Sequence, residues 1–200
     1  MNIAGARNRV RLITDREDVA YFTDAEIDGF LAMSVDEFVS QYYNSFESNQ
    51  DSRDKLQKIV FSSVVSVSDS VPYSIAGLVN SETTPVANYS KMLSMVMSLS
   101  PFKRVKIIQL SDLSAYLDDP FNKADTNNPV AYLSGDNIYT KGLSSSTSID
   151  VKYLSDTTLV TDLSSHTHEE VCQIAARKIL ATLGDVRYQA IQSEIAERRV

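Results

Sequence analysis

The chain has 200 residues, with 26 acidic and 19 basic side chains and a formal net charge of −7. This balance argues against wrapping of nucleic acid and against an anionic membrane surface, since both would repel an acidic protein. The single cysteine, Cys172, excludes an intrachain disulfide and suits a reducing compartment. No stretch is long and apolar enough to span a membrane, so we expect a protein made in the cytoplasm.

The first predicted element is a helix that begins at Thr23. Thr23 and Glu26 have the spacing of a capping box, in which each side chain accepts a hydrogen bond from the backbone amide of the other residue. Apolar residues then recur at three- and four-residue steps, which predicts one core-facing stripe. The pattern weakens at 48–51 and resumes, so a second helix or a kinked continuation should run to about residue 60.

Residues 62–161 are rich in serine and β-branched side chains, a composition that favours strands. The turn sequence at 135–137 separates two apolar runs and predicts a hairpin. Asp-Pro at 119–120 and Asn-Pro at 128–129 bound a longer polar excursion, predicted to be a surface loop. Five runs have the length and composition of a strand: SSVVSVS (62–68), MLSMVMSL (92–99), RVKIIQL (104–110), NPVAYL (128–133) and SIDVKYL (148–154).

From 167 onward the pattern is helical again. Thr167 and Glu170 repeat the capping-box spacing, and Gly184 offers a helix end. One apolar face of this helix should pack on the sheet or on the first helix; its members are Val171, Cys172, Ala175, Ala176, Ile179 and Leu183. The whole pattern predicts an α+β fold in a single domain over 1–200: about 23–60 helical, 62–161 mainly antiparallel β, and 167–200 a helix or helix pair.

The C-terminal tail carries a second apolar stripe, formed by Tyr188, Ile191 and Ile195. At about 100° per residue, it is turned by roughly 150° from the stripe of the preceding helix, so one straight helix cannot bury both against one core. Either the tail folds back onto its own chain, or the stripe faces a partner, which is another subunit or the portal. We favour the partner, because polar residues surround three apolar anchors, and take these residues as a candidate subunit interface.

No catalytic equipment is apparent. His168 and Cys172 are four residues apart, a spacing that suits zinc, but no third ligand accompanies them and Cys172 falls on the apolar stripe. A buried cysteine beside a helix cap is therefore the preferred interpretation. The basic runs at 7–11 and 103–106 could contact phosphate, but solvated faces are more usual in an acidic protein. We expect no catalytic residue, no metal and no cofactor.

Several motifs occur in order along the chain: RNRVRLITDREDVAYFTDAEIDGFL (7–31), FESNQDSRDKL (46–56), Asp112-Leu113, Asp119-Pro120-Phe121 with Pro129, Tyr153-Leu154, HEEV (168–171) and DVRYQ (185–189). With these motifs the chain resembles the head-to-tail connector or ring (stabilisation) structural proteins of short-tailed crAss-like bacteriophages. It departs from their pattern before the last helix, where Ser164 and Ser165 replace a proline.

The resemblance implies a non-enzymatic virion protein, assembled in the bacterial host cytoplasm into a closed ring between portal and tail. Expected partners are further copies of the chain, with an expected twelvefold symmetry, the portal, and other connector or tail proteins. DNA would pass through the ring without specific binding, and an acidic wall would leave it free to slide. The alternative is a phage-encoded, non-enzymatic binding module that acts on a host or virion protein as a monomer or dimer.

Overall fold

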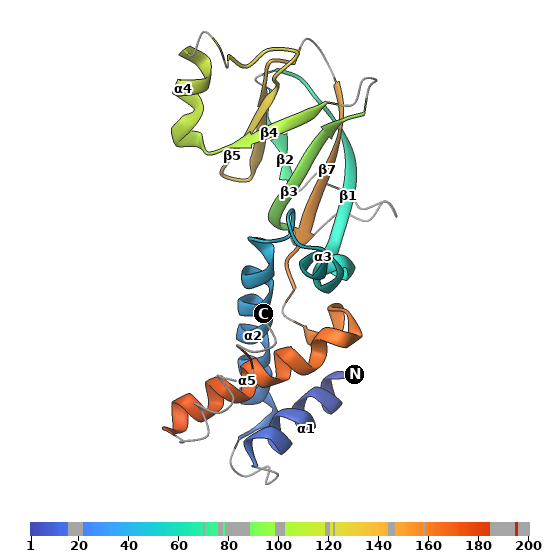
Figure 1. The fold of residues 1–200 in the computed structure, drawn as a ribbon, viewed down its shortest axis with the longest axis vertical. Coiled ribbons are helices and arrows are strands. Elements are labelled where there is room, and N and C mark those ends of the chain that lie inside the picture. Colours follow the sequence, from blue (N-terminus) through green and yellow to red (C-terminus); the bar gives the residue numbers. More distant parts are fainter. Residues whose placement is uncertain are drawn as a thin grey trace. The chain divides into compact units, whose positions relative to one another are not determined.

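A computed structural model gives the fold of the chain (Figure 1). It describes residues 1–15, 22–69, 71–75, 78, 89–98, 103–118, 121, 123–143, 147–157, 159–184 and 195. The predicted α+β class is confirmed, with helices toward both ends and a central, mostly antiparallel sheet. The contacts divide the chain into two compact units. Unit 1 combines 1–59 with 157–200, and unit 2 is 60–156.

Unit 1 is helical. Helix α5 contacts both α1 and α2 and is buried along most of its length (Figure 1). Short 3-10 turns at Gln57–Ile59, Val160–Asp162 and Ser165–Thr167 connect the helices. The helices of this unit are α1 (Ile3–Thr14), α2 (Asp24–Tyr43), α3 (Gln50–Leu56) and α5 (His168–Leu183).

Helix α1 is absent from the sequence prediction, which interpreted its basic run as a solvated face. Its buried residues are Ala6, Val10 and Thr14, and their four-residue spacing places them on one side of the helix. Asn2 caps the start, where its side-chain oxygen accepts a 2.8 Å hydrogen bond from the Gly5 amide. The sequence analysis missed this narrow buried stripe, because arginines dominate the composition of the segment.

The break predicted at 48–51 is confirmed. Helix α2 ends at Tyr43, turns follow, and Asn49 caps α3 by accepting a 2.9 Å hydrogen bond from the Asp51 amide. The predicted end of α5 at Gly184 is also confirmed, with φ at 66°. The apolar face predicted for α5 is correct except at Leu183, which is 38% exposed. Ile174 and Leu180 are buried in addition, since α1 and α2 both cover the helix.

Unit 2 contains a seven-stranded sheet in the order β1-β7-β3-β4-β5-β6-β2. All neighbours pair antiparallel except β4 and β5, which are parallel. The predicted hairpin is the β5–β6 turn, where Gly135 has a φ of 57°. All five predicted strands are present, and the strands are β1 (Val60–Val67), β2 (Tyr73–Ser74), β3 (Tyr89–Met97), β4 (Arg104–Ile108), β5 (Val130–Ser134), β6 (Asn137–Lys141) and β7 (Thr147–Ser155).

The core of unit 2 follows the period of two along its strands. Ile149, Val151 and Tyr153 of β7 are at most 1% exposed and pack with buried residues of β1, β3, β4, β5 and β6. The parallel β4–β5 pair requires a crossover connection, which the chain supplies with the excursion at 109–129. This excursion contains α4 (Leu113–Asp118), a helix that the sequence analysis did not predict and that ends just before the predicted surface loop at 119–129.

Candidate interaction site

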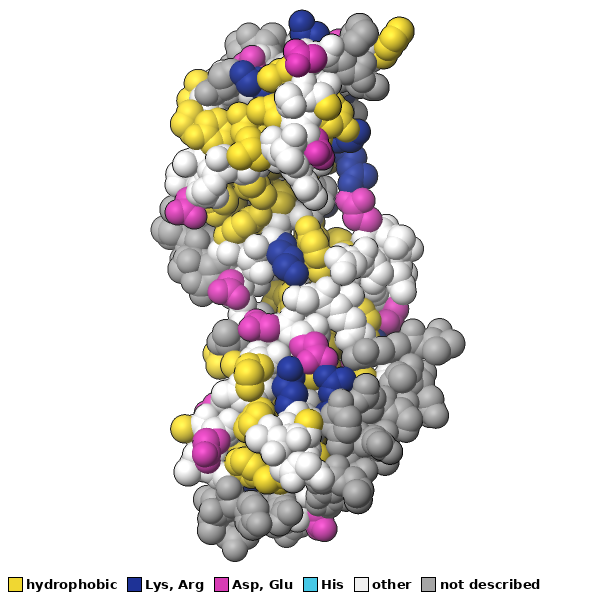
Figure 2. Space-filling view, turned by 90° about the vertical axis from the view of Figure 1, so that its left-hand side faces the viewer, with side chains coloured by type: hydrophobic (Ala, Val, Ile, Leu, Met, Phe, Trp, Pro, Cys, Tyr) yellow, Lys and Arg dark blue, Asp and Glu magenta, His cyan; other side chains and the backbone are white. Residues whose placement is uncertain are grey.

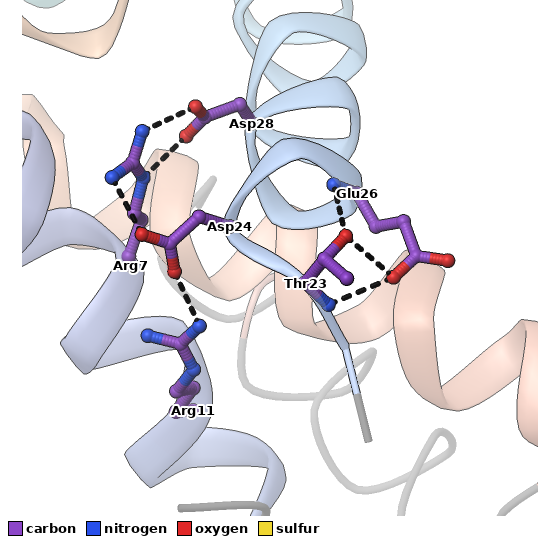
Figure 3. A network of polar contacts seen from close by, with 6 residues as sticks. All are labelled: Arg7, Arg11, Thr23, Asp24, Glu26 and Asp28. Atoms are coloured by element: carbon purple, nitrogen blue, oxygen red, sulfur yellow. Dashed lines mark hydrogen bonds and ion pairs between the residues drawn. The ribbon is translucent and has the colours of Figure 1, made fainter. Parts of the chain in front are cut away.

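The capping box predicted at the start of α2 is confirmed (Figure 3). The Thr23 amide donates to Glu26 Oε2 at 2.8 Å, and the Glu26 amide donates to Thr23 Oγ1 at 3.3 Å. The hydrogen bond from the backbone amide stabilises the carboxylate and holds the pKa of Glu26 below its ordinary value. Just before the cap, the Phe22 ring packs edge-on against Phe30.

The second predicted capping box, Thr167 with Glu170, is wrong. Thr167 already has helical backbone angles, because the 3-10 turn Ser165–Thr167 precedes α5 directly. Its hydroxyl therefore donates backward to the Ser164 carbonyl at 2.7 Å instead of accepting from the helix. Glu170 is only 6% exposed and takes part in a different contact, inside unit 1.

That contact is a buried polar cluster of Tyr42, Lys55 and Glu170, which joins α2, α3 and α5. Tyr42 donates its hydroxyl to Glu170 Oε1 at 2.6 Å, and Lys55 Nζ donates to the Tyr42 oxygen at 2.7 Å. Lys55 Nζ also lies 3.3 Å from Glu170 Oε2 and 3.0 Å from Asp51 Oδ2. Each charged member thus has an opposite charge within the cluster, as burial requires.

Burial and hydrogen bonding act in opposite directions on Lys55. Desolvation by itself would lower its pKa, but the hydrogen bonds to Tyr42 and Asp51 and the charge of Glu170 raise it. Burial, followed by the bond to Glu170, also raises the pKa of the Tyr42 phenol. At neutral pH Lys55 is therefore an ammonium and Tyr42 a neutral phenol. Their hydrogen bonds and the charge of Glu170 link the three helices.

The arginines of the basic run at 7–11 are all paired with carboxylates of the same chain. Arg7 donates to Asp28 and to Asp24, each at 2.8 Å, and Arg11 donates to Asp24 at 2.6 Å (Figure 3). Arg9 forms a two-nitrogen contact with Glu169 of α5. The hydrogen bond from Arg11 lowers the pKa of Asp24. These contacts neutralise the positive charge of the basic run within one copy of the chain.

The residues weighed as zinc ligands lie in the core. His168 Nε2 is 3.1 Å from the Leu163 carbonyl, and Cys172 is fully buried with Sγ 3.9 Å from the Ala6 carbonyl. Burial raises the pKa of the Cys172 thiol to about 12 and lowers the pKa of His168. Within the described part of the chain, no three His, Cys, Asp or Glu side chains are grouped so as to hold a metal ion.

Of the candidate interface residues in the tail, Ile195 alone belongs to the described residues. It is 1% exposed, which favours the alternative in which the tail folds back onto its own chain. Tyr188 and Ile191 lie outside the described residues, so their role in a subunit interface stays a prediction.

An exposed apolar surface surrounds α4. We name it the α4 surface and define it by Ile107, Leu110, Leu117 and Phe121, which are 37%, 52%, 40% and 90% exposed. Neither α4 nor the 3-10 turn before it contributes a buried residue. Figure 2 views the molecule from the side on which α4 lies in Figure 1, and hydrophobic side chains gather in its upper part. The leucines at 110, 113 and 117 have helical spacing, a signal that could have revealed the helix.

Residues 123–128, which lead from the excursion back to β5, are held in place by side-chain hydrogen bonds. Asp125 Oδ1 accepts hydrogen bonds from the amides of Asn127 and Asn128 at 2.7 and 2.8 Å, and Lys103 Nζ donates to the Thr126 carbonyl at 3.0 Å. Gly142 lies directly against Asp125, where a Cβ atom would come within 2.6 Å of its carbonyl oxygen. The α4 surface therefore extends from an ordered base rather than from a free loop.

Comparison with models of known protein families and with curated protein sequences gives no match to this chain. Among the helices described, none is both long and apolar enough to cross a membrane.

Proposed function

We propose that the chain is a virion structural protein that forms a ring in the portal-to-tail connector of a short-tailed bacteriophage, with DNA passing through the ring. The motifs shared in order with connector and ring proteins support this proposal. In it, the partners are further copies of the chain, the portal and other connector or tail proteins, and no step of catalysis, metal or cofactor is involved.

The observation that carries the proposal is the internal pairing of Arg7, Arg9 and Arg11. A wall that guides DNA must not retain it, and phosphate contacts are made by cations that release counterions. Here the charges of one of the two basic runs, residues 7–11, are paired with Asp24, Asp28 and Glu169. The net charge of −7, repeated around a ring, would then repel the phosphate backbone and let DNA slide.

The test is the composition and structure of purified virions. Mass spectrometry of virions should detect the chain in several copies per particle, and electron cryo-microscopy should place it as a ring between portal and tail. A lumen lined by Arg7, Arg9 and Arg11 would contradict the sliding argument. Absence of the chain from virions, together with a monomer or dimer bound to a host protein in infected cells, would instead support the binding-module alternative.

A further inference from the structure

Exposed apolar side chains are concentrated in the α4 surface. Eleven large hydrophobic side chains are exposed in the described part of the chain, and four of them lie between 107 and 121. Single exposed hydrophobic residues are ordinary on soluble proteins, whereas contiguous patches mark contacts with a partner. Since α4 adds nothing to the core of unit 2, core packing does not account for its leucines.

Of these four residues Leu117 lies in α4, and Leu113, which is half-buried, lies on the same side of the helix. At about 100° per residue, Leu113 and Leu117 are separated by roughly 40°, whereas Ala115 points to the opposite side of α4. Tyr116 flanks the leucines, and Lys106 Nζ lies 4.6 Å from the centre of its ring. The surface is therefore an apolar stripe bordered by a cation, the usual anatomy of the centre and rim of an interface.

Charge indicates which partner fits. The segment 103–129 has no net charge, whereas the remaining residues carry the whole net charge of −7. Two copies of an acidic chain repel each other over most of their surface, and a neutral apolar segment is where they can approach with the least penalty. The charged residues of the segment are Lys103, Arg104, Lys106 and Lys123 with Asp112, Asp118, Asp119 and Asp125.

We propose that a second copy of this chain covers the α4 surface, and that this contact joins neighbouring subunits. The inference rests on the proposed function, because a closed ring is built from heterologous contacts in which one face of a subunit meets a different face of the next. The apolar stripe supplies the centre of this contact. Lys106, which lies over the Tyr116 ring, supplies a cation at the edge of the stripe that complements the acidic remainder of the neighbouring copy.

The experiment measures self-association of the full-length protein by sedimentation and native mass spectrometry over a range of concentrations. Leu117→Glu places a charge in the stripe, and Ala115→Glu places the same charge on the opposite side of the same helix. We expect the wild type and Ala115→Glu to assemble, and Leu117→Glu to lose roughly thirtyfold or more in association constant, the size of an interface hot spot. Circular dichroism and thermal unfolding verify that each variant is folded. If Leu117→Glu is not folded, Leu110→Ser takes its place as the test variant.

Three results would overturn the inference: a wild type that stays monomeric, a Leu117→Glu variant that assembles like Ala115→Glu, or an equal loss in both glutamate variants. The virion experiment distinguishes a failure of this inference from a failure of the proposed function. A virion ring in which the α4 surface faces solvent would refute the inference alone. Self-association through the α4 surface by a chain absent from virions would refute the proposed function alone.

Discussion

The hydroxyl of Tyr42 donates a 2.6 Å hydrogen bond to the carboxylate of Glu170, 128 positions further along the chain. Replacing Glu170 with alanine would remove this bond and one of the carboxylates that face the buried ammonium of Lys55. We expect Glu170→Ala to lower the free energy of unfolding by about 3 kcal/mol, because an incompletely paired charge then stays in a low-dielectric site. Urea denaturation measures the change.

The neighbouring Glu169→Ala is the matched control for that experiment. Glu169 pairs with Arg9 at the surface of the helix pair, where solvent screens the charges. Its loss should cost less than about 1 kcal/mol. Equal losses in the two variants would show that the buried cluster contributes no more than a surface ion pair.

The cap at the start of α2 gives a second prediction. Thr23→Ala removes the oxygen that accepts from the Glu26 amide and should cost about 1 kcal/mol of stability. Thr23→Ser keeps that oxygen and should restore most of the loss. If serine were as destabilising as alanine, the methyl group and not the cap would explain the effect. Thermal unfolding of the three proteins provides the comparison.

Stability should also depend on the protonation of His168. Burial lowers the pKa of its imidazole in the folded state from the ordinary value of 6.5, and the nearby charge of Lys58 acts in the same direction. Below pH 6.5 the unfolded chain therefore binds a proton that the folded chain does not. The free energy of unfolding consequently decreases as the pH falls. The stability from this group is fully present above pH 6.5 and is lost as the pH falls toward the lowered folded-state value.

Unfolding free energies measured as a function of pH for His168→Gln and His166→Gln test this assignment. His166→Gln leaves the buried imidazole of His168 in place, so this variant should keep most of the acid dependence of the wild type. His168→Gln should show a shallower fall in stability below pH 6.5. Identical pH profiles for both variants would place the titrating group elsewhere.

The compensated arginines predict how DNA affinity responds to charge. Asp24→Asn removes the carboxylate that contacts both Arg7 and Arg11. It should strengthen non-specific DNA binding by freeing Arg11, while Arg7 keeps its contact with Asp28. Asp36→Asn makes the same charge change at an exposed position of α2 that contacts no arginine among the described residues, and it should have little effect. Fluorescence anisotropy with duplex DNA at fixed salt measures both. Equal strengthening would show that only net charge matters.

The elements that the sequence predicts well are those in which local chemistry and core packing agree. The Thr23 cap, the Gly135 turn and the β7 alternation are all of this kind. Thr167 shows the limit, since the same letters at the same spacing do not cap once a 3-10 turn has already begun the helix. Spacing alone does not reveal which residue first adopts helical angles.

The tertiary contacts could not be predicted from the sequence. Glu170 meets Tyr42 and Lys55 only because α5 packs beside α2 and α3, and no local pattern encodes a pairing over such a separation. Helix α4 was missed for a different reason. The leucines at 110, 113 and 117 have helical spacing, but the helix has only six residues, none of them buried, and the turn signal Asp119-Pro120 follows it directly.

The division of the chain into units bears on the order of folding. Unit 2 is one continuous segment, and its first and last strands are antiparallel partners, with Val60 opposite Leu154. Once this sheet has formed, it holds the ends of the two helical segments close to each other. Loop closure costs about 0.6 kcal/mol more with each doubling of loop length, so the formed sheet spares α2 and α5 part of the entropy of a long closure. Changes that delay the β1–β7 pairing should therefore delay formation of the helical core as well.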